Sequence, residues 1–264
     1  MNFKKNLHME LEQILDFTLR LIKDAGKIPA EHFGNKLHID FKGRHDLVTE
    51  YDKKTENFIV SKINETYPDH QIEGEEGTAK DGRGYKWIID PIDGTTNFSH
   101  GNPVFAVSIG LQKDEELVLG AIYAPILNEL FYASKNNGAF LNGKPIKVSE
   151  VKIVDEALMA TGFNPRYSEE NIPHFRHFLD ASQGVRRLGA ASLDMCNIAA
   201  GRLDGYWEYG LKAWDIAAGA IIIKEAGGDI SGLKGEKLDL YSERMICSNG
   251  KIHEEMVEYF KKIL

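Results

Sequence analysis

The chain has 264 residues, 42% of them hydrophobic and 27% charged, which is the composition of an ordinary globular protein. Its net charge of -8 argues against a general nucleic-acid binder, and no stretch has the character of a signal peptide or a membrane span. Two cysteines, Cys196 and Cys247, make no disulfide framework, so we expect a cytoplasmic protein with free thiols.

The first predicted elements are two helices that carry packing residues. Apolar side chains recur at helical spacing over residues 11–25, and Gly26 is expected to end that helix. A second helix carries apolar residues between 58 and 63 on its inner face. Asp46 and Asp52 precede or open this helix, and each taken alone is typical of a capping acid.

A short turn with two adjacent acids follows. Glu75 and Glu76 stand between glycines, a pattern that usually indicates a solvated turn. A cation site near Asp90 would need a further carboxylate, however, so Glu75 is a candidate metal ligand.

The stretch 87–98, which reads WIIDPIDGTTNF, is the most informative part of the chain. An apolar strand ends on Asp90 and Asp93, and the proline between them has a fixed φ and no amide hydrogen. Gly94 permits a tight turn, after which Thr95 can open a short helix. Acids on a rigid turn beside free backbone amides can hold a hard cation and a phosphate together. The alternative is a strand end with capping acids, which the density of acids disfavours.

Short strands and then alternating strands and helices follow this stretch. Residues 104–148 predict an antiparallel meander, in which Asn142-Gly143 is typical of a hairpin turn. The succession predicts a layered α+β fold. Further strands are expected at 157–161, at 204–209 and around 246, and helices at 169–181, 192–200, 214–226 and the C-terminus.

Acids from separate points of the chain could converge on one site: Glu75, Asp90, Asp93 and Asp215. Burying them unpaired would be prohibitive, and Mg²⁺ is the natural counter-charge because it prefers oxygen ligands. Two such ions about 4 Å apart can clamp an in-line displacement at phosphorus. No cluster of histidines and cysteines favours zinc, and no glycine-rich nucleotide loop is present.

The stretch 87–98 resembles the signature of the inositol monophosphatase family of Mg²⁺-dependent, lithium-sensitive sugar phosphatases. The resemblance implies an α-β-α-β-α sandwich over residues 1–264 as one domain, usually a homodimer. Residues 1–150 would supply the metal-binding turn, and 151–264 would complete the substrate site. Other segments resemble family motifs in the same order: Asp46-Leu47-Val48-Thr49 with Asp52, Gly74-Glu75-Glu76, Trp214-Asp215-Ile216-Ala217-Ala218-Gly219 and Glu225-Ala226-Gly227-Gly228.

The resemblance also implies a metal-binding set. Glu75, Asp90 and the carbonyl of Ile92 would hold a first Mg²⁺. Asp90, Asp93 and Asp215 would hold a second, so that Asp90 bridges the two ions. A third, weaker ion could share Glu75.

Catalytic and substrate-binding roles follow from the same resemblance. A metal-activated water would attack, oriented by Glu75 and the Thr95 hydroxyl, with Asp46 supporting Thr95. Arg186 and Arg187 could bind an anion or form a subunit contact. The substrate-binding set is Ile92, Asp93, Gly94, Thr95, Gly189, Ala190, Ala191, Glu208 and Asp215, with the amides of Gly94 and Thr95 receiving the phosphate.

We therefore expect a phosphatase that acts on a small polyol or sugar monophosphate, with myo-inositol 1-phosphate as the first candidate. Fructose-1,6-bisphosphate, histidinol phosphate and 3′-phosphoadenosine 5′-phosphate are alternatives, although Thr96-Asn97-Phe98 favours the inositol branch. A regulatory binding protein is the alternative of another class, and the intact acids argue against it because a scaffold has no reason to retain buried charge. Neither nucleic acid nor a membrane is an expected partner.

Overall fold

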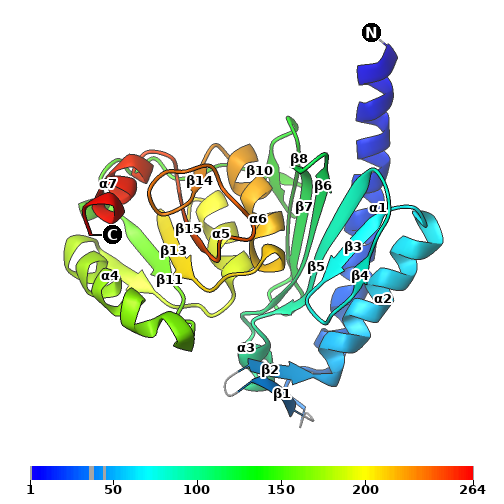
Figure 1. Cartoon of the computed structure of the whole chain (residues 1–264), viewed down its shortest axis with the longest axis horizontal. Helices are drawn as coiled ribbons and strands as arrows, with labels where there is room; N and C mark the ends of the chain where they lie inside the picture. The colour runs from blue at the N-terminus through cyan, green and yellow to red at the C-terminus, as the bar shows by residue number, and fades with distance from the viewer. Residues whose placement is uncertain (1, 36–38, 44–45, 264) are drawn as a thin grey trace.

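Helices and sheets alternate in five layers across the molecule, in the order helix, sheet, helix, sheet, helix (Figure 1). The computed structural model describes residues 2–35, 39–43 and 46–263. The observed order confirms the α-β-α-β-α sandwich that the family resemblance implies, and with it the layered α+β class.

The larger sheet has eight strands in the described part of the chain, in the order β10-β9-β8-β7-β6-β5-β3-β4. From β5 onward each strand pairs antiparallel with the next, which confirms the predicted meander, whereas β3 lies parallel to β5. Asn142 and Gly143 form the predicted two-residue turn between β9 and β10, both with positive φ. The strands are β3 (Gln71–Gly74), β4 (Ala79–Lys80), β5 (Tyr85–Asp93), β6 (Ala106–Lys113), β7 (Glu116–Ala124), β8 (Glu129–Ser134), β9 (Ala139–Leu141) and β10 (Lys144–Ile146).

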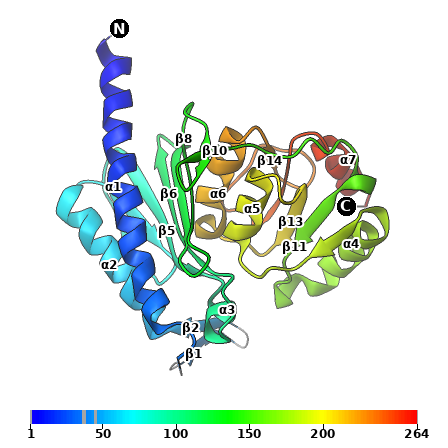
Figure 2. The same ribbon diagram turned by 180° about the vertical axis from the view of Figure 1, so that it is seen from behind.

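Two helices, α1 (Asn2–His32) and α2 (Glu50–Thr66), cover the outer face of this sheet (Figure 2). Alternate residues of β5 point to opposite faces of the sheet. Trp87 and Ile89 therefore pack against α1 and α2, whereas Ile88 packs on the inner side, against the middle layer.

The prediction that Gly26 ends the first helix is wrong, because α1 continues to His32. Gly26 lies against the ring of Tyr123, and a Cβ at this position would come within 2.6 Å of the ring. The glycine therefore allows the helix to approach β7 closely, and it does not stop the helix.

Two helices, α5 (Ala191–Ala199) and α6 (Ala213–Glu225), form the middle layer between the sheets. Both faces of α6 meet a sheet, so the helix is apolar on almost every side. The first turn of α6 lies beside the end of β5, because carboxylate oxygens of Asp215 in α6 and of Asp90 and Asp93 in β5 lie within 4.8 Å of one another.

The smaller sheet has five strands in the described part of the chain, in the order β12-β11-β13-β15-β14. The last helix layer covers its outer face, where aromatic and aliphatic side chains form a separate core. These elements are β11 (Leu158–Thr161), β12 (Gly184–Arg186), β13 (Gly205–Tyr209), β14 (Asp229–Ser231), β15 (Arg244–Ser248), α4 (Ser168–Ala181) and α7 (His253–Ile263).

Short elements lie at one end of the larger sheet. The hairpin β1 (Ile39–Gly43) and β2 (Asp46–Thr49) leads into α2, and the short helix α3 (Thr95–Ser99) follows β5 and lies against β2. Two 3₁₀ turns, Val154–Glu156 and Pro165–Tyr167, flank β11. Among the described residues, no helix combines the length and the apolarity that crossing a bilayer requires.

Candidate active site

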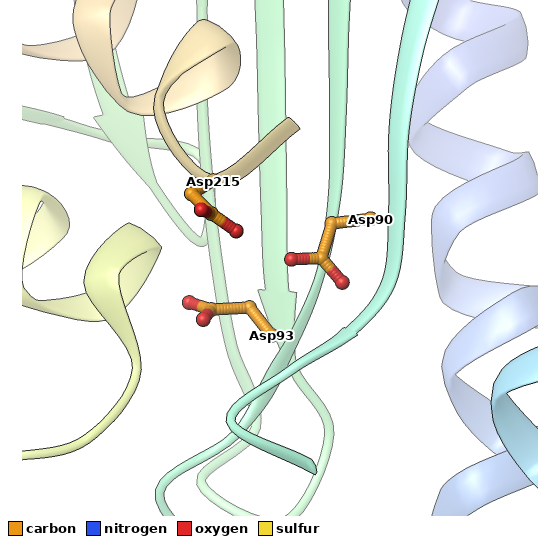
Figure 3. Close-up of side chains that lie close together, drawn as sticks. All are labelled: Asp90, Asp93 and Asp215. Atoms are coloured by element: carbon orange, nitrogen blue, oxygen red, sulfur yellow. The ribbon is translucent and has the colours of Figure 1, made fainter. Parts of the chain in front are cut away.

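Three predicted acids converge between the two sheets. Asp90 and Asp93 lie at the end of β5, and Asp215 lies in the first turn of α6. Each offers a carboxylate oxygen within 4.8 Å of the other two, and the three side chains surround a common space (Figure 3). Asp90 and Asp93 are buried, with 1% and 7% of their surface exposed.

An irregularity in β5 turns both acids to the same side. Asp90 pairs with Ser108 and Asp93 with Ala106. The partners are three residues apart on β5 but only two apart on β6, so β5 contains one extra residue here. Residues three apart on a regular strand point to opposite faces, and one extra residue cancels this alternation. The amide of Ile92 donates a 3.0 Å hydrogen bond to Asp90 Oδ1 and fixes the turn.

The electrostatic state of these acids is consistent with a cation site. Burial raises the pKa of Asp90 well above its usual range, and the charges of Glu75, Asp93 and Asp215 raise it further. Burial also raises the pKa of Asp215, with Asp93 as the next cause. These buried oxygen donors repel one another and fit a site for Mg²⁺, because that ion prefers oxygen ligands.

Glu75 reaches the same cluster from the turn between β3 and β4. Its amide donates a 3.1 Å hydrogen bond to the carbonyl of Ile89, which ties the turn to β5. A hydrogen bond and a like charge from Glu75 both raise the pKa of Asp90, so the two side chains are neighbours. The structure therefore brings all four predicted acids together.

Asp93 also joins the two halves of the chain. Its Oδ2 accepts hydrogen bonds from the Ser192 hydroxyl and, at 2.8 Å, from the Ser192 amide, and its Oδ1 accepts one of 3.2 Å from the Ala191 amide. Burial raises the pKa of Asp93, while these bonds lower it. The end of β5 is thus fixed to the first turn of α5.

Asp52 provides a carboxylate that accepts a hydrogen bond from Thr95, a partner not predicted from the sequence. Thr95 Oγ1 lies 3.0 Å from Asp52 Oδ1 and 2.9 Å from the carbonyl oxygen of Ile92. Asp46 begins β2, and its side chain lies outside the described residues. The predicted support of Thr95 by Asp46 stays a prediction.

Asp52 is a capping residue as well as a partner of Thr95. It is fully buried, and its Oδ2 accepts from the Thr49 amide at 2.8 Å and the Thr49 hydroxyl at 2.6 Å. Thr49 and Asp52 form a capping box at the start of α2. The three-residue spacing was visible in the sequence, but a cap explains it fully, so it gave no signal of a second role.

Gly94 makes the turn from β5 into α3 possible. Its φ of +89° is in the left-handed region, and a Cβ there would come within 3.0 Å of the Val104 carbonyl oxygen and 3.1 Å of that of Gly189. Gly94 thereby lies beside Gly189, which is another predicted substrate contact.

A pocket of about 200 Å³ opens beside the acids. A larger groove of about 1050 Å³ lies along β7, α6 and α7 and is lined by none of the four acids. The predicted substrate residues that line the smaller pocket are Asp93, Gly189, Ala190, Ala191, Glu208 and Asp215. Ile92, Gly94 and Thr95 are not among its lining residues.

Glu208 lies in the wall of this pocket, and its surroundings raise its pKa. Burial raises its pKa from 4.5 to about 7, against the lowering effect of a hydrogen bond that the Tyr206 hydroxyl donates. The positive charge of Arg187 also lowers the pKa of Glu208. Near neutral pH the carboxyl group can therefore donate or accept a hydrogen bond.

Asp194 lies in the same wall and was not among the residues predicted from the sequence. It is 1% exposed, and its Oδ1 has no hydrogen-bond partner within the described part of the chain. Burial raises its pKa well above the usual range, as do the charges of Glu208 and Asp93. An acid in the mostly apolar helix α5 was the available signal.

Arg187 faces the pocket rather than only the surface. It lines the pocket, and its guanidinium would collide with a Cβ at Gly189. Its charge lowers the pKa of both Glu208 and Asp194. Of the two roles left open for this arginine, its position agrees with anion binding; that role stays a prediction.

Comparisons with known proteins agree with this geometry. A model of the inositol monophosphatase family matches residues 10–264. An inositol-1-monophosphatase of Synechocystis sp. is 41% identical over 253 residues, which cover 94% of this chain and 88% of that protein. A fructose-1,6-bisphosphatase/inositol-1-monophosphatase of Thermotoga maritima is 38% identical, covering 95% of this chain and 96% of its own length.

A solved structure gives the same result for the fold. The extragenic suppressor protein suhB of Bartonella henselae superposes with a TM-score of 0.91 and 33% identity. The match covers 96% of this chain and 100% of that chain, so both sheets and all helix layers are included.

Proposed function

The chain belongs to the inositol monophosphatase family and is a phosphoric monoester hydrolase, and from this premise we propose that it hydrolyses a small polyol or sugar monophosphate, myo-inositol 1-phosphate first among them. The observation that supports this most directly is the convergence of Asp90, Asp93 and Asp215 beside a pocket lined by hydrogen-bonding side chains. The acids would hold cations at the phosphate, and the pocket would hold the alcohol.

We propose Mg²⁺ as the cofactor, because the donors are all hard oxygens. Glu75, Asp90 and the Ile92 carbonyl would hold one ion, Asp90, Asp93 and Asp215 a second, and Glu75 would contribute to a third, weaker one. When bound, the ions would stabilise the negative charge that develops on the phosphoryl group and lower the pKa of water.

Thr95 and Glu75 would orient the attacking water. The hydroxyl proton of Thr95 is directed to Asp52 or to the carbonyl of Ile92, so its oxygen remains free to accept a hydrogen bond from water. The carboxylate of Glu75 would accept the water's other proton. In the proposed geometry the amides of Gly94 and Thr95 would receive the phosphate oxygens.

The pocket favours hydroxyl groups over a second phosphate. Asp93, Glu208 and Asp215 in its wall are acidic, and a second phosphate would find only Arg187 as a positive charge among the described lining residues. Fructose-1,6-bisphosphate is the second candidate, because the Thermotoga maritima relative is named for that activity as well.

A substrate panel tests the proposal. The purified protein would be assayed with Mg²⁺ for phosphate release from myo-inositol 1-phosphate, fructose-1,6-bisphosphate, histidinol phosphate and 3′-phosphoadenosine 5′-phosphate, with a chelator as the metal-free control. We expect the highest kcat/KM with the inositol ester. Cleavage of the nucleotide with every polyol ester left intact would refute the assignment.

We further propose that the chain acts as a single domain in a cytoplasmic homodimer. The family resemblance supports the dimer, and the two buried free cysteines, Cys196 and Cys247, are consistent with a reducing compartment. Light scattering on the purified protein would test the dimer, and a monomer at micromolar concentration would refute it.

A further inference from the structure

Glu56 is a buried carboxylate of α2 that grips the turn carrying Glu75. It is 2% exposed. Its Oε2 accepts a 2.8 Å hydrogen bond from the Glu76 amide, and its Oε1 accepts from the Thr78 amide at 3.2 Å and the Thr78 hydroxyl at 2.6 Å. A buried carboxylate is costly unless it is fully hydrogen-bonded, and these bonds satisfy both oxygens.

The turn lies so close to Glu56 that it needs a glycine. A Cβ at Gly74 would come within 2.5 Å of Glu56 Oε2. On its other side the turn is tied to β5 by the hydrogen bond from the Glu75 amide to Ile89. Glu75 therefore lies between two anchors, one on the sheet and one on α2.

The same face of α2 holds the other group that would orient water. Asp52 and Glu56 are four residues apart, so their side chains lie on one side of the helix, one turn from each other. Asp52 holds the Thr95 hydroxyl, while Glu56 holds the backbone that follows Glu75. One helix thus holds the hydroxyl of Thr95 and the backbone beside Glu75, the two groups proposed to orient the water.

We propose that Glu56 is a positioning residue for Glu75, through which α2 sets the distance between Glu75 and the Asp90–Asp93 turn. Glu56 is not one of the three acids that surround the common space, and it is not among the described residues that line the pocket. Its effect would pass through the backbone of residues 74–78. The inference rests on the proposed function, since it assigns Glu75 to the metal and the water.

The chain offers a matched control in Asp204. This acid is also buried, at 6% exposure, and its carboxylate also accepts from a backbone amide and a hydroxyl, those of Leu158 and Ser149. These bonds join the loop before β13 to the start of β11 and to the segment after β10, and they do not involve Glu75. Asp204→Asn should therefore reproduce the structural cost of losing a buried, bonded carboxylate.

The experiment compares the wild type with Glu56→Gln and Asp204→Asn. Calorimetry of Mg²⁺ binding without substrate, thermal unfolding without metal, and steady-state kinetics would be measured for each. A glutamine directs NH groups at backbone NH groups, so the turn should shift. We expect both variants to unfold at lower temperature, but only Glu56→Gln to bind Mg²⁺ about 10- to 100-fold more weakly, as loss of outer-shell partners does.

Kinetics and a second variant complete the test. Glu56→Gln should lower kcat at limiting Mg²⁺, with little change in the KM for substrate. If Glu56→Gln does not fold, Gly74→Ala moves the turn while retaining the carboxylate and should weaken Mg²⁺ binding likewise. Mg²⁺ affinity and kcat equal to those of Asp204→Asn would overturn the positioning role.

The outcomes separate this inference from the proposed function. A wild type that binds Mg²⁺ but cleaves no polyol phosphate would refute the proposed substrate, and the Mg²⁺ affinities would still decide the role of Glu56. A wild type that does not bind Mg²⁺ would refute both.

Discussion

The surroundings of Asp90 oppose its negative charge. Burial and three other acids raise its pKa, so its negative charge destabilises the metal-free fold and is useful only when a cation is present. Function and stability therefore place opposite demands on this position.

We predict that Asp90→Asn has effects of opposite sign on activity and on stability. It should lower kcat/KM by more than about 100-fold, beyond what the loss of a metal's outer partners costs. In a chelator at pH 8 it should raise the unfolding temperature, because one repelling charge is gone. Exposed Asp81 offers the control Asp81→Asn, which should change neither quantity. A variant that keeps wild-type turnover would contradict the assignment.

Glu208 predicts a pH dependence of stability. The fold raises the pKa of Glu208 from 4.5 to about 7. Between pH 4.5 and pH 7 the folded protein therefore retains a proton that the unfolded chain has lost. Its stabilising contribution is therefore complete below pH 4.5 and disappears as the pH rises through 7.

We predict that Glu208→Gln, which cannot ionise, avoids this loss. In metal-free protein the variant and the wild type should have similar free energies of unfolding near pH 4.5. At pH 8 the variant should be more stable, by up to about 3 kcal/mol for a shift of this size. Urea unfolding at both values measures the difference. If the difference in free energy of unfolding between the variant and the wild type is the same at both pH values, Glu208 has no raised pKa in the folded protein.

At the scale of elements, α2 supports the site through its first two turns. Asp52 completes the capping box of α2 with the N-cap Thr49 and is also the partner of Thr95. These two roles can be separated by mutation because Thr49 takes part only in the first. Loss of an N-cap costs about 1 kcal/mol.

We predict that Thr49→Ala and Asp52→Asn both destabilise the protein, but that only the second has a large effect on catalysis. Asp52→Asn should lower kcat about 10- to 100-fold, in the range of a lost outer partner of a metal site, with KM changed less. The measurement is steady-state kinetics beside thermal unfolding of both variants. An equal fall of kcat in Thr49→Ala would mean that α2 acts only through its stability.

The sequence was sufficient for the elements that depend on periodicity. The apolar run into Asp90, the meander and the Asn142-Gly143 turn follow from local chemistry, and the structure has them as predicted. Gly26 shows the limit of this reasoning. The sequence does not distinguish a glycine that ends a helix from one that, as here, lets a tyrosine ring pack against the helix.

Site residues could be predicted from the sequence only where no local structural role, such as capping a helix, already explained the residue. Asp52 forms a capping box with Thr49, and nothing local says that it also reaches Thr95, 43 residues further along the chain. Glu56 was invisible for the same reason, because its partners lie 20 and 22 residues further along the chain.

At the scale of the whole molecule, the site exists only where distant parts of the chain meet. Asp90 and Asp93 belong to the larger sheet, Glu75 to the turn beside it, and Asp215 to the helix between the sheets. A cation bound among them would join all of these parts at once. Its binding should therefore be visible as global stability as well as activity.

We predict that Mg²⁺ raises the unfolding temperature of the wild type in proportion to the logarithm of its concentration. At about 100 times the dissociation constant the gain is about 2.7 kcal/mol, if the unfolded chain does not bind the ion. For a chain of this size that gain corresponds to a shift of roughly 5–10 °C. Differential scanning calorimetry over a Mg²⁺ series measures it, with KCl at equal ionic strength to remove the screening effect. Asp90→Asn should show little of the shift. A shift that KCl reproduces would mean that salt screens the acids without any ion binding among them, and the convergence of Asp90, Asp93 and Asp215 would then have no metal to explain it.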